Sequence, residues 1–402
     1  MNDSGVEVTA LCQFERVQHQ RFTVQYDYPV YFTEGLFRSG NGAFCEALSR
    51  KEHEKRHRFA VFVDENVAAA RPRLLTDIVA YAEHNRQTLE LVAPPETVPG
   101  GEAVKNDPQL VERLQRRLLT LGIDRHSFVV AIGGGAVLDL IGFVAATTHR
   151  GVRHVRVPTT VLAQNDSGVG VKNGVNAFQI KNFVGTFAPP FAVLNDIEFL
   201  HALEPRDKIA GMAEAVKVAL IRDAEFFAWL EAHSDDLVAF RPQAVAYMIR
   251  RCAELHMHQI AHGGDPFESG SARPLDYGHW AAHKLEVLTH NALRHGEAVA
   301  IGLALDSRYS VLVGMLAPGN EVRICALLEK LGFALWDPML DEHDGDGRLA
   351  VLAGLRDFRE HLGGELTITL LRGIGVGDEV HEMHEGEIRA AIAWLKQRRG
   401  PR

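Results

Sequence analysis

Two histidines and a glutamate in the second half of the chain are of the residue types that bind a metal ion. His279 and His283 are four residues apart in the run GHWAAHKLE, so a helix would present both on one face. His295 begins the run HGEAVAIG, and Glu214 lies in the apolar helical run AEAVKVAL. Two imidazoles and one carboxylate are a common ligand set for catalytic zinc with an open position. The spacing alone also allows a purely structural role for the HxxxH pair.

Lys217 lies three residues after Glu214 in the same run, so the two share a helix face. An ion pair on the protein surface would explain this spacing, but the residues around it are apolar. We therefore group the pair with the candidate metal ligands.

A glycine-rich turn in the first half fits a dinucleotide. The three glycines at 133–135 follow an apolar strand and begin a helix. Glycines let the backbone approach a pyrophosphate, and the amides of a helix N-terminus attract it. The run is not GxGxxG, however, and a tight strand–helix turn explains it equally well. Asp64, Asn66 and Asp139 could bind ribose hydroxyls or could serve as turn and capping residues.

The segment 156–190, RVPTTVLAQNDSGVGVKNGVNAFQIKNFVGTFAPP, is more specific. A plain loop has no need for two lysines and several amides among so many glycines, whereas a site for phosphates and hydroxyls does. Its polar residues are Thr159, Thr160, Asp166, Lys172, Asn176, Lys181 and Asn182.

Bulk properties limit the class of protein. A chain of 402 residues exceeds one comfortable hydrophobic core and should form two domains. A net charge of −9 argues against a nucleic-acid or membrane partner. There is no run of about 18 apolar residues and no apolar leader segment, and the four cysteines are scattered. We expect a cytoplasmic protein with reduced, buried thiols.

The predicted elements change character near residue 200. Short apolar strands alternate with helices in the first half, which predicts a parallel sheet covered on both faces. Long Ala- and Leu-rich helical runs follow from about Glu204. We predict an α/β dinucleotide-binding domain over 1–200 and an all-α metal- and substrate-binding domain over 201–402. Ligands should bind at the strand ends and in the cleft between the domains.

Five blocks, in order, resemble the dehydroquinate synthase superfamily of sugar phosphate cyclases. They are GGGAVLDLIGFVAATTHRG, VPTTVLAQNDSGVGVKNGVN, GMAEAVKVALIRDAEFF, GHWAAHKLE and HGEAVAIG. The resemblance implies the two-domain fold above, bound NAD and Zn²⁺ (with Co²⁺ as an alternative), a sugar phosphate substrate and a homodimer. It also implies phosphate elimination followed by intramolecular aldol closure of a carbocycle.

Site residues follow from the resemblance position by position. The implied metal ligands are Glu214, His279 and His295. The implied cofactor residues are Asp64, Asn66, Glu102, Lys105, Gly134, Gly135, Asp139, Thr159, Thr160 and Lys181, the last of which also neighbours the substrate. The implied catalytic residues are Arg150, Asp166, Lys172, Lys217 and His283, and Asn182 is an implied substrate contact.

The chain departs from dehydroquinate synthases where those enzymes hold a substrate carboxylate. The lysine, arginine and asparagine of that subsite are matched here by His258, Ala272 and Asp276. Each lost charge-assisted contact is worth roughly 1.5–3 kcal/mol, and an added carboxylate disfavours an anionic substrate. Arg273 could compensate. Asp276 is better suited to accept hydrogen bonds from hydroxyl groups.

Two further runs, RPLDYGH and FREHLGG (358–364), resemble the C7-cyclitol branch that cyclises sedoheptulose 7-phosphate. This branch contains the 2-epi-5-epi-valiolone and 2-epi-valiolone synthases. Arg359 and His361 are then candidate substrate contacts, although a polar turn explains them equally well. His283 keeps the dehydroquinate synthase character. We predict a sedoheptulose 7-phosphate cyclase, with dehydroquinate synthase, a metal-dependent polyol dehydrogenase and a non-catalytic binding protein as alternatives.

Overall fold

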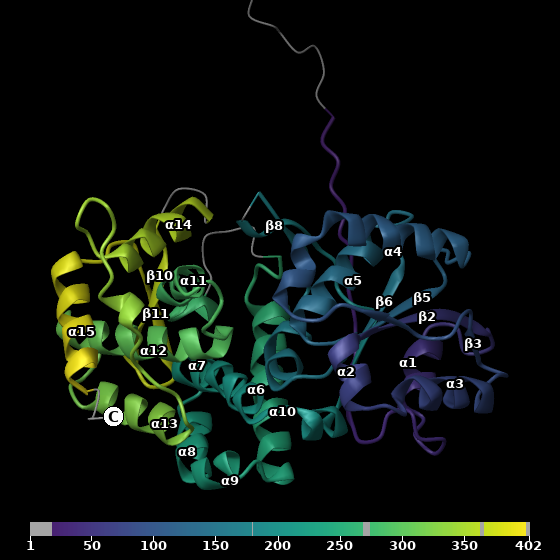
Figure 1. The fold of residues 1–402 in the computed structure, drawn as a ribbon, viewed down its shortest axis with the longest axis horizontal. Coiled ribbons are helices and arrows are strands. Elements are labelled where there is room, and N and C mark those ends of the chain that lie inside the picture. The colour runs from purple at the N-terminus through teal and green to yellow at the C-terminus, as the bar shows by residue number, and fades with distance from the viewer. Residues whose placement is uncertain (1–17, 179, 268–273, 362–365, 399–402) are drawn as a thin grey trace, which may run out of the picture.

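A seven-stranded sheet forms the centre of the first half of the molecule (Figure 1). The structure, a computed structural model, describes residues 18–178, 180–267, 274–361 and 366–398, without the side chains of 274, 360 and 361. The strands run in the order β1-β9-β6-β5-β2-β3, with β4 also paired to β2, and every pair is parallel. They are β1 (Val30–Thr33), β2 (His57–Asp64), β3 (Leu89–Leu91), β4 (Glu96–Val98), β5 (Phe128–Gly133), β6 (Arg153–Pro158) and β9 (Ala192–Asp196).

Helices cover both faces of this sheet, as the alternating sequence pattern predicts. Successive side chains of a strand point to opposite faces, so Phe59, Val61 and Val63 of β2 join one core while Ala60 and Phe62 join another. The first core includes α1 (Ala43–Ser49) and α3 (Leu74–His84). The second includes α4 (Pro108–Thr120) and α5 (Gly135–Thr147). The short helix α2 (Glu65–Ala70) and the 3₁₀ turn Glu102–Asn106 follow strand ends.

A separate hairpin lies on α5. Its antiparallel strands are β7 (Lys172–Ala177) and β8 (Ile180–Phe187), and β7 packs against α5. A π-helical turn, Ala163–Ser167, joins β6 to this hairpin. Irregular helical turns of this kind often occur at functional sites. The hairpin and the turn together carry most of the polar residues of the segment 156–190.

The described part of the second half has helices and one hairpin as its regular elements (Figure 1). Its helices are α6 (Pro205–Ala210), α7 (Met212–Arg222), α8 (Ala224–Ala232), α9 (Ser234–Val238), α10 (Pro242–His262), α11 (His279–Leu288), α12 (His295–Leu312), α13 (Asn320–Lys330), α14 (Ala353–His361) and α15 (Glu385–Arg398). The hairpin, β10 (Ile368–Gly373) with β11 (Val376–Val380), is a correction to the predicted all-α domain. Its buried side chains Ile368, Leu370 and Leu371 belong to the helical core.

Two helices at the centre of this half are buried on all sides. Every residue of α7 from Met212 to Ile221 is buried, as are most residues of α12. A helix without an exposed face lies inside a domain. Long helix α10 packs on the π-helical turn and so joins the two halves. No helix of the described residues is both long and apolar enough to cross a membrane.

Candidate active site

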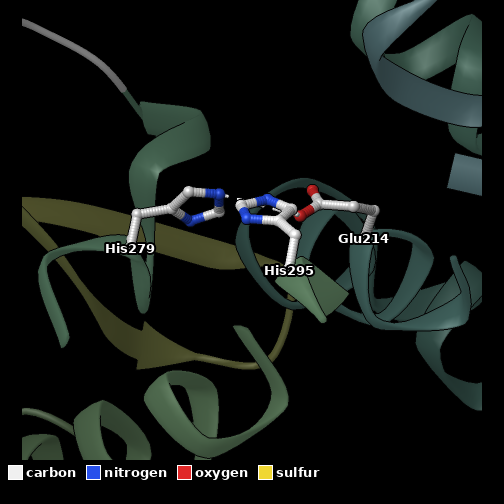
Figure 2. Close-up of side chains that lie close together, drawn as sticks. All are labelled: Glu214, His279 and His295. Carbon is white, nitrogen blue, oxygen red and sulfur yellow. Dashed lines mark ion pairs between the residues drawn. The ribbon is translucent and has the colours of Figure 1, made fainter. Parts of the chain in front are cut away.

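Three side chains from three helices of the second half converge on one point (Figure 2). Glu214 comes from α7, while His279 and His295 are the first residues of α11 and α12. Glu214 Oε1 lies 3.7 Å from His279 Nε2 and 3.6 Å from His295 Nε2. The three ligand atoms lie within 4.8 Å of one another, which suits a single metal ion. These are the three residues that the resemblance implies as metal ligands.

The donor atoms at this point are oriented for a divalent ion. Glu214 Oε1 is buried and has no hydrogen-bond partner among the described residues. His279 Nδ1 lies 3.0 Å from the backbone oxygen of Tyr277, and His295 Nδ1 lies 3.1 Å from Glu286 Oε2. Hydrogen bonds at Nδ1 leave both Nε2 atoms for a metal. The residues therefore fit a metal ion with one carboxylate and two imidazole ligands.

The charge states of the three groups suit this role. Burial lowers the pKa of His279 well below its ordinary value, so this imidazole is neutral. Burial opposes ionisation of Glu214, but Lys217 and His295 outweigh it and lower the pKa of the carboxyl to about 2. Burial also opposes protonation of His295, but the carboxylates of Glu214 and Glu286 outweigh it and raise its pKa to about 9. In this state His295 carries a proton that a metal ion would displace.

Lys217 is the counter-ion of Glu214, as their spacing predicts. The ammonium pairs with Glu214 Oε2, and both side chains are buried. Burial lowers the pKa of Lys217, but Glu214 and Asp166 outweigh it and hold this pKa above its ordinary value. The negative charge of Asp276 adds to the same shift.

An aspartate of α12 anchors the turn that carries His279. Gly278, with φ +77°, ends this turn directly before α11, and its N–H donates to Asp306 Oδ2 at 3.1 Å. Trp280 Nε1 donates to Asp306 Oδ1 at 2.9 Å. A Cβ on Gly302 would lie 2.0 Å from the backbone oxygen of Gly278. The turn and α12 are therefore in backbone contact, which fixes where His279 begins α11.

The candidate cofactor residues gather at the carboxyl edge of the sheet. Asp64 ends β2 and accepts hydrogen bonds from the backbone N and Nδ2 of Asn66 at 2.9 and 3.1 Å. Gly134 precedes α5 and has no side chain with which to cap it. Thr159 N donates to the oxygen of Gly133 at 3.0 Å and so holds the end of β6 beside this turn. Free amides at such a helix start can bind a phosphate. Gly135 and Thr160 lie at the same edge, as the first residue of α5 and the second residue after β6.

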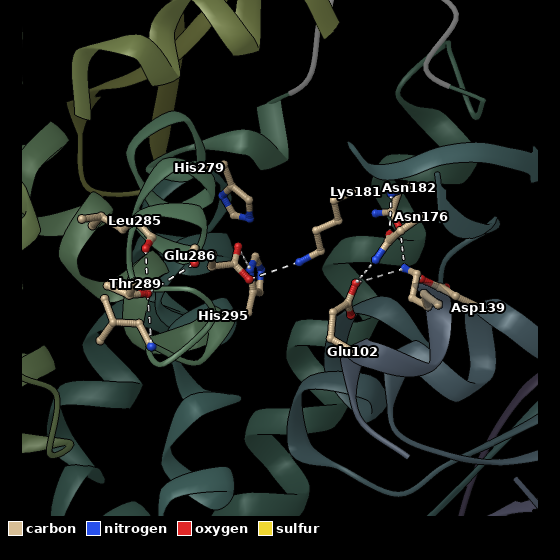
Figure 3. Close-up of polar contacts among 12 residues, drawn as sticks. Glu102, Asp139, Asn176, Lys181, Asn182, His279, Leu285, Glu286, Thr289 and His295 are labelled. Carbon is tan, nitrogen blue, oxygen red and sulfur yellow. Dashed lines mark hydrogen bonds and ion pairs between the residues drawn. The ribbon is translucent and has the colours of Figure 1, made fainter. Parts of the chain in front are cut away.

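A polar network connects this edge to the hairpin (Figure 3). Lys105 Nζ lies 2.9 Å from Asp139 Oδ2 and 3.8 Å from Glu102 Oε1, and it donates to Asn182 Oδ1. Asn182 N in turn donates to Asn176 Oδ1 at 2.8 Å. The structure thus brings together four of the residues assigned to cofactor and substrate.

The carboxylate of Glu286 joins the hairpin to the metal ligands, and the sequence analysis missed it. Glu286 Oε2 contacts His295 Nδ1, while Glu286 Oε1 lies 3.1 Å from Lys181 Nζ (Figure 3). Glu286 lies three residues after His283 on α11, so the two share a helix face, but this spacing does not indicate its contact with His295 on α12.

His256 is a second missed residue and replaces His258 beside the π-helical turn. His256 Nδ1 lies 2.8 Å from Asp166 Oδ1. His258 is exposed and stacks on His262, with ring centroids 4.4 Å apart. Residues two apart on a helix point about 200° apart, so only one of the two can face Asp166. His258 therefore does not face Asp166, and its assignment to the substrate stays a prediction.

The remaining predicted residues lie at different distances from this centre. His283 is exposed, with its ring centroid 5.4 Å from that of His279 and 6.0 Å from that of His295. Lys172 is exposed at the start of β7, and Arg359 is exposed on α14. Arg150 precedes β6 and therefore lies at the amino edge of the sheet. The candidate cofactor residues of its own chain lie at the opposite, carboxyl edge. Arg273 and the side chain of His361 lie outside the described residues.

Comparison with protein families gives an assignment that agrees with this geometry. Residues 96–210 match the family "3-dehydroquinate synthase N-terminal", and residues 211–346 match "3-dehydroquinate synthase C-terminal". The chain belongs to the 3-dehydroquinate synthase family. It is therefore an enzyme of the sugar phosphate cyclase type.

Curated relatives of this dehydroquinate synthase family member cover most of the chain. A 3-dehydroquinate synthase of Cereibacter sphaeroides is 39% identical over 335 residues, which are 81% of this chain and 86% of the relative. One from Acidithiobacillus ferrooxidans is 35% identical over 355 residues, which are 87% and 90% of the two chains.

Solved structures include a cyclitol synthase of the same fold. The 2-epi-5-epi-valiolone synthase of Streptomyces hygroscopicus subsp. jinggangensis 5008, solved with NAD+ and Zn2+ bound, is 29% identical and has a TM-score of 0.84. The match covers 95% of this family member and 100% of that chain. A protein of Sinorhizobium meliloti 1021 described as a "probable glycerol dehydrogenase", 18% identical with a TM-score of 0.56 over 92% and 96% of the two chains, shares the fold alone.

Proposed function

We propose that this enzyme is an NAD- and zinc-dependent cyclase of sedoheptulose 7-phosphate that forms a C7 cyclitol. The observation that carries the substrate choice is the carboxylate of Asp276, which acts on Lys217 together with Asp166 and Glu214. A substrate carboxylate at this position would face several negative charges, whereas a hydroxyl group could donate to them. The likeness to a 2-epi-5-epi-valiolone synthase over 95% of the chain supports the same substrate class.

The residues present fit both proposed cofactors. Glu214, His279 and His295 would hold the zinc ion, and the carboxyl edge of β2, β5 and β6 would hold NAD. When bound, NAD would supply reversible hydride transfer, and zinc would supply positive charge to substrate hydroxyl oxygens.

The chain's own side chains would orient the substrate and compensate its charge. Lys217 is buried and protonated, so its ammonium can donate to a substrate oxygen beside the metal ligands. Lys181 and Lys172 of the hairpin can approach a phosphate group. His283, the exposed imidazole nearest the ligands, is placed to exchange protons between its ring nitrogens and solvent.

The first test compares two substrates. Purified enzyme with NAD and Zn²⁺ is given sedoheptulose 7-phosphate or 3-deoxy-arabino-heptulosonate 7-phosphate, and released phosphate is measured. We expect release from the first alone, without net formation of NADH. Release from the second alone would refute the substrate proposal and establish a 3-dehydroquinate synthase.

3-Dehydroquinate synthase is the second candidate, because relatives of that name are up to 39% identical to this chain. We expect Asp276→Asn to lower kcat/KM for sedoheptulose 7-phosphate by about tenfold or more, since a charge-assisted contact is worth about 1.5–3 kcal/mol. Asp265→Asn, outside the proposed contacts, is the matched control. Unchanged kinetics for Asp276→Asn would remove the basis of the substrate choice. The homodimer and the cytoplasmic location stay predictions.

A further inference from the structure

We propose that Glu286 is a positioning residue for the metal ligand His295 and that Lys181 anchors it from the other half of the molecule. The inference rests on the metal centre proposed above but adds a residue that is not one of its ligands. It concerns how the chain holds an imidazole in place before any metal binds.

The two oxygens of Glu286 have different partners. Oε2 lies 3.1 Å from His295 Nδ1, and Oε1 lies 3.1 Å from Lys181 Nζ (Figure 3). The carboxylate is buried, with a side chain that is 7% exposed. A buried carboxylate with a distinct partner on each oxygen has little freedom to rotate.

The contact with His295 determines which ring nitrogen faces the metal position. The Nδ1–H donates to Glu286, so the Nε2 atom is directed toward Glu214 Oε1 at 3.6 Å. His279 obtains the same orientation from the backbone oxygen of Tyr277. His295 is the first residue of α12, and among the described residues its Nδ1 contacts the side chain of Glu286 in place of a backbone oxygen.

The contact with Lys181 crosses between the halves of the enzyme. Lys181 belongs to β8 of the first half, and Glu286 belongs to α11 of the second. The next residue, Asn182, accepts from Lys105, which also pairs with Asp139 at the start of α5. Two consecutive residues of β8 therefore contact the metal side and the proposed NAD side. Lys181 should act on the metal only through Glu286.

Four variants separate these contacts. Glu286→Ala loses both. Glu286→Gln keeps an oxygen that accepts from His295 Nδ1–H but cannot accept from Lys181 on its amide nitrogen. Lys181→Met loses the contact between Lys181 and Glu286 but keeps the contact between Glu286 and His295. Asp357→Ala is the matched control, because Asp357 is an exposed carboxylate that pairs with Lys284 on the same helix α11.

The measurement is the dissociation constant of Zn²⁺ by chelator competition, with the visible spectrum of the Co²⁺-loaded protein as a second readout. Loss of such a metal-supporting contact weakens metal binding by about 10–100-fold, and we expect this for Glu286→Ala. Glu286→Gln and Lys181→Met should each weaken Zn²⁺ binding only a few-fold. The double variant Glu286→Gln/Lys181→Met should weaken Zn²⁺ binding no more than either single change. Asp357→Ala should bind as the wild type does.

Each outcome bears on a defined part of the proposal. A Glu286→Ala protein that binds Zn²⁺ within twofold of the wild type overturns the positioning role. Glu286→Gln as weak as Glu286→Ala overturns it too, because charge rather than orientation would then matter. Additive losses of Zn²⁺ affinity in the double variant would show that Lys181 does not act through Glu286. Wild-type protein that binds neither ion refutes the metal centre itself, which is the failure of the proposed function.

Discussion

Glu214 is the residue on which the metal centre most depends. Its carboxylate is buried between two imidazoles and the ammonium of Lys217, and Lys217 is itself only 3% exposed. A buried charge that loses its partner costs about 3–5 kcal/mol. Truncation at this position therefore affects both the metal and the fold.

We expect Glu214→Ala to abolish metal binding and turnover and to lower the free energy of unfolding by about 3–5 kcal/mol, because Lys217 is left unpaired. Glu214→Gln should also lose the metal but keep more stability, since its amide oxygen can still accept from Lys217. Metal content by mass spectrometry and urea unfolding measure the two effects. Turnover by metal-free Glu214→Ala protein would contradict the assignment.

Asp306 gives the fold a pH dependence that is independent of any ligand. Burial raises the pKa of Asp306 from 3.8 to about 7, although hydrogen bonds from Trp280 and Gly278 oppose the shift. The folded state thus binds this proton more tightly than the unfolded state. The resulting stabilisation is complete below the pKa that the Asp306 carboxyl has in the unfolded state. It is lost as the pH rises through the pKa of this carboxyl in the folded state.

We therefore expect the free energy of unfolding to fall by roughly 2–3 kcal/mol between pH 5 and 8 through Asp306 alone. Urea unfolding of the metal-free wild type and of Asp306→Asn measures this, since the variant cannot titrate there. Parallel pH profiles of the two proteins would show that Asp306 keeps one charge state throughout.

Residue types and spacing could predict the metal ligands but not the residues that hold them. Glu214, His279 and His295 carry metal-binding groups, and the resemblance aligned them. Glu286 and Asp306 are ordinary acidic residues in helices, and only the packing of α11 against α12 gives them partners. His256 and His258 are indistinguishable by composition, and the rotation of α10 decides between them.

At the scale of elements, the contact between α12 and the turn before α11 positions His279. Gly302→Ala would place a methyl group 2.0 Å from the backbone oxygen of Gly278, so one element must move. We expect a loss of about 1–3 kcal/mol in stability, as for overpacked cores, together with weaker Zn²⁺ binding. Thermal unfolding and chelator competition measure both.

Gly386→Ala is the control for this prediction, because Gly386 lies in α15 and a Cβ there would have no atom within 4 Å. Alanine is the better helix former, so this variant should gain about 0.5–1 kcal/mol. A Gly302→Ala protein that gains stability in the same way would show that the two elements are not in tight contact.

The elements themselves could be predicted where hydrophobic periodicity was strong. The predicted alternation of short apolar strands with helices in the first half is confirmed by the buried strands β2, β5 and β6 and the helices α3, α4 and α5. Hairpin β10–β11 was missed, because its buried run ITLL is as apolar as the helices around it and the domain was assigned by its composition. Periodicity alone does not distinguish a short buried strand from a buried helix segment.

At the scale of the whole molecule, the proposed ligands bind different halves, which the contact between Lys181 and Glu286 connects. A chelator should lower the thermal midpoint of the wild type, and Zn²⁺ with NAD should restore and raise it. A ligand at one hundred times its dissociation constant stabilises by about 2.7 kcal/mol. Glu214→Gln should respond to NAD but not to the chelator. An equal response to the chelator in both proteins would place the metal elsewhere.

The hairpin β7–β8 should tolerate changes of residue type better than changes in its length. Lys181 and Asn182 are consecutive residues of β8 but contact opposite halves of the molecule, at an irregular point of the hairpin where Asn182 has φ +54°. Inserting or deleting one residue between Ala177 and Ile180 would exchange the two directions, and the ammonium would then point away from Glu286. Chains of this architecture should therefore vary in the outward-facing residues of the hairpin while keeping its residue count constant.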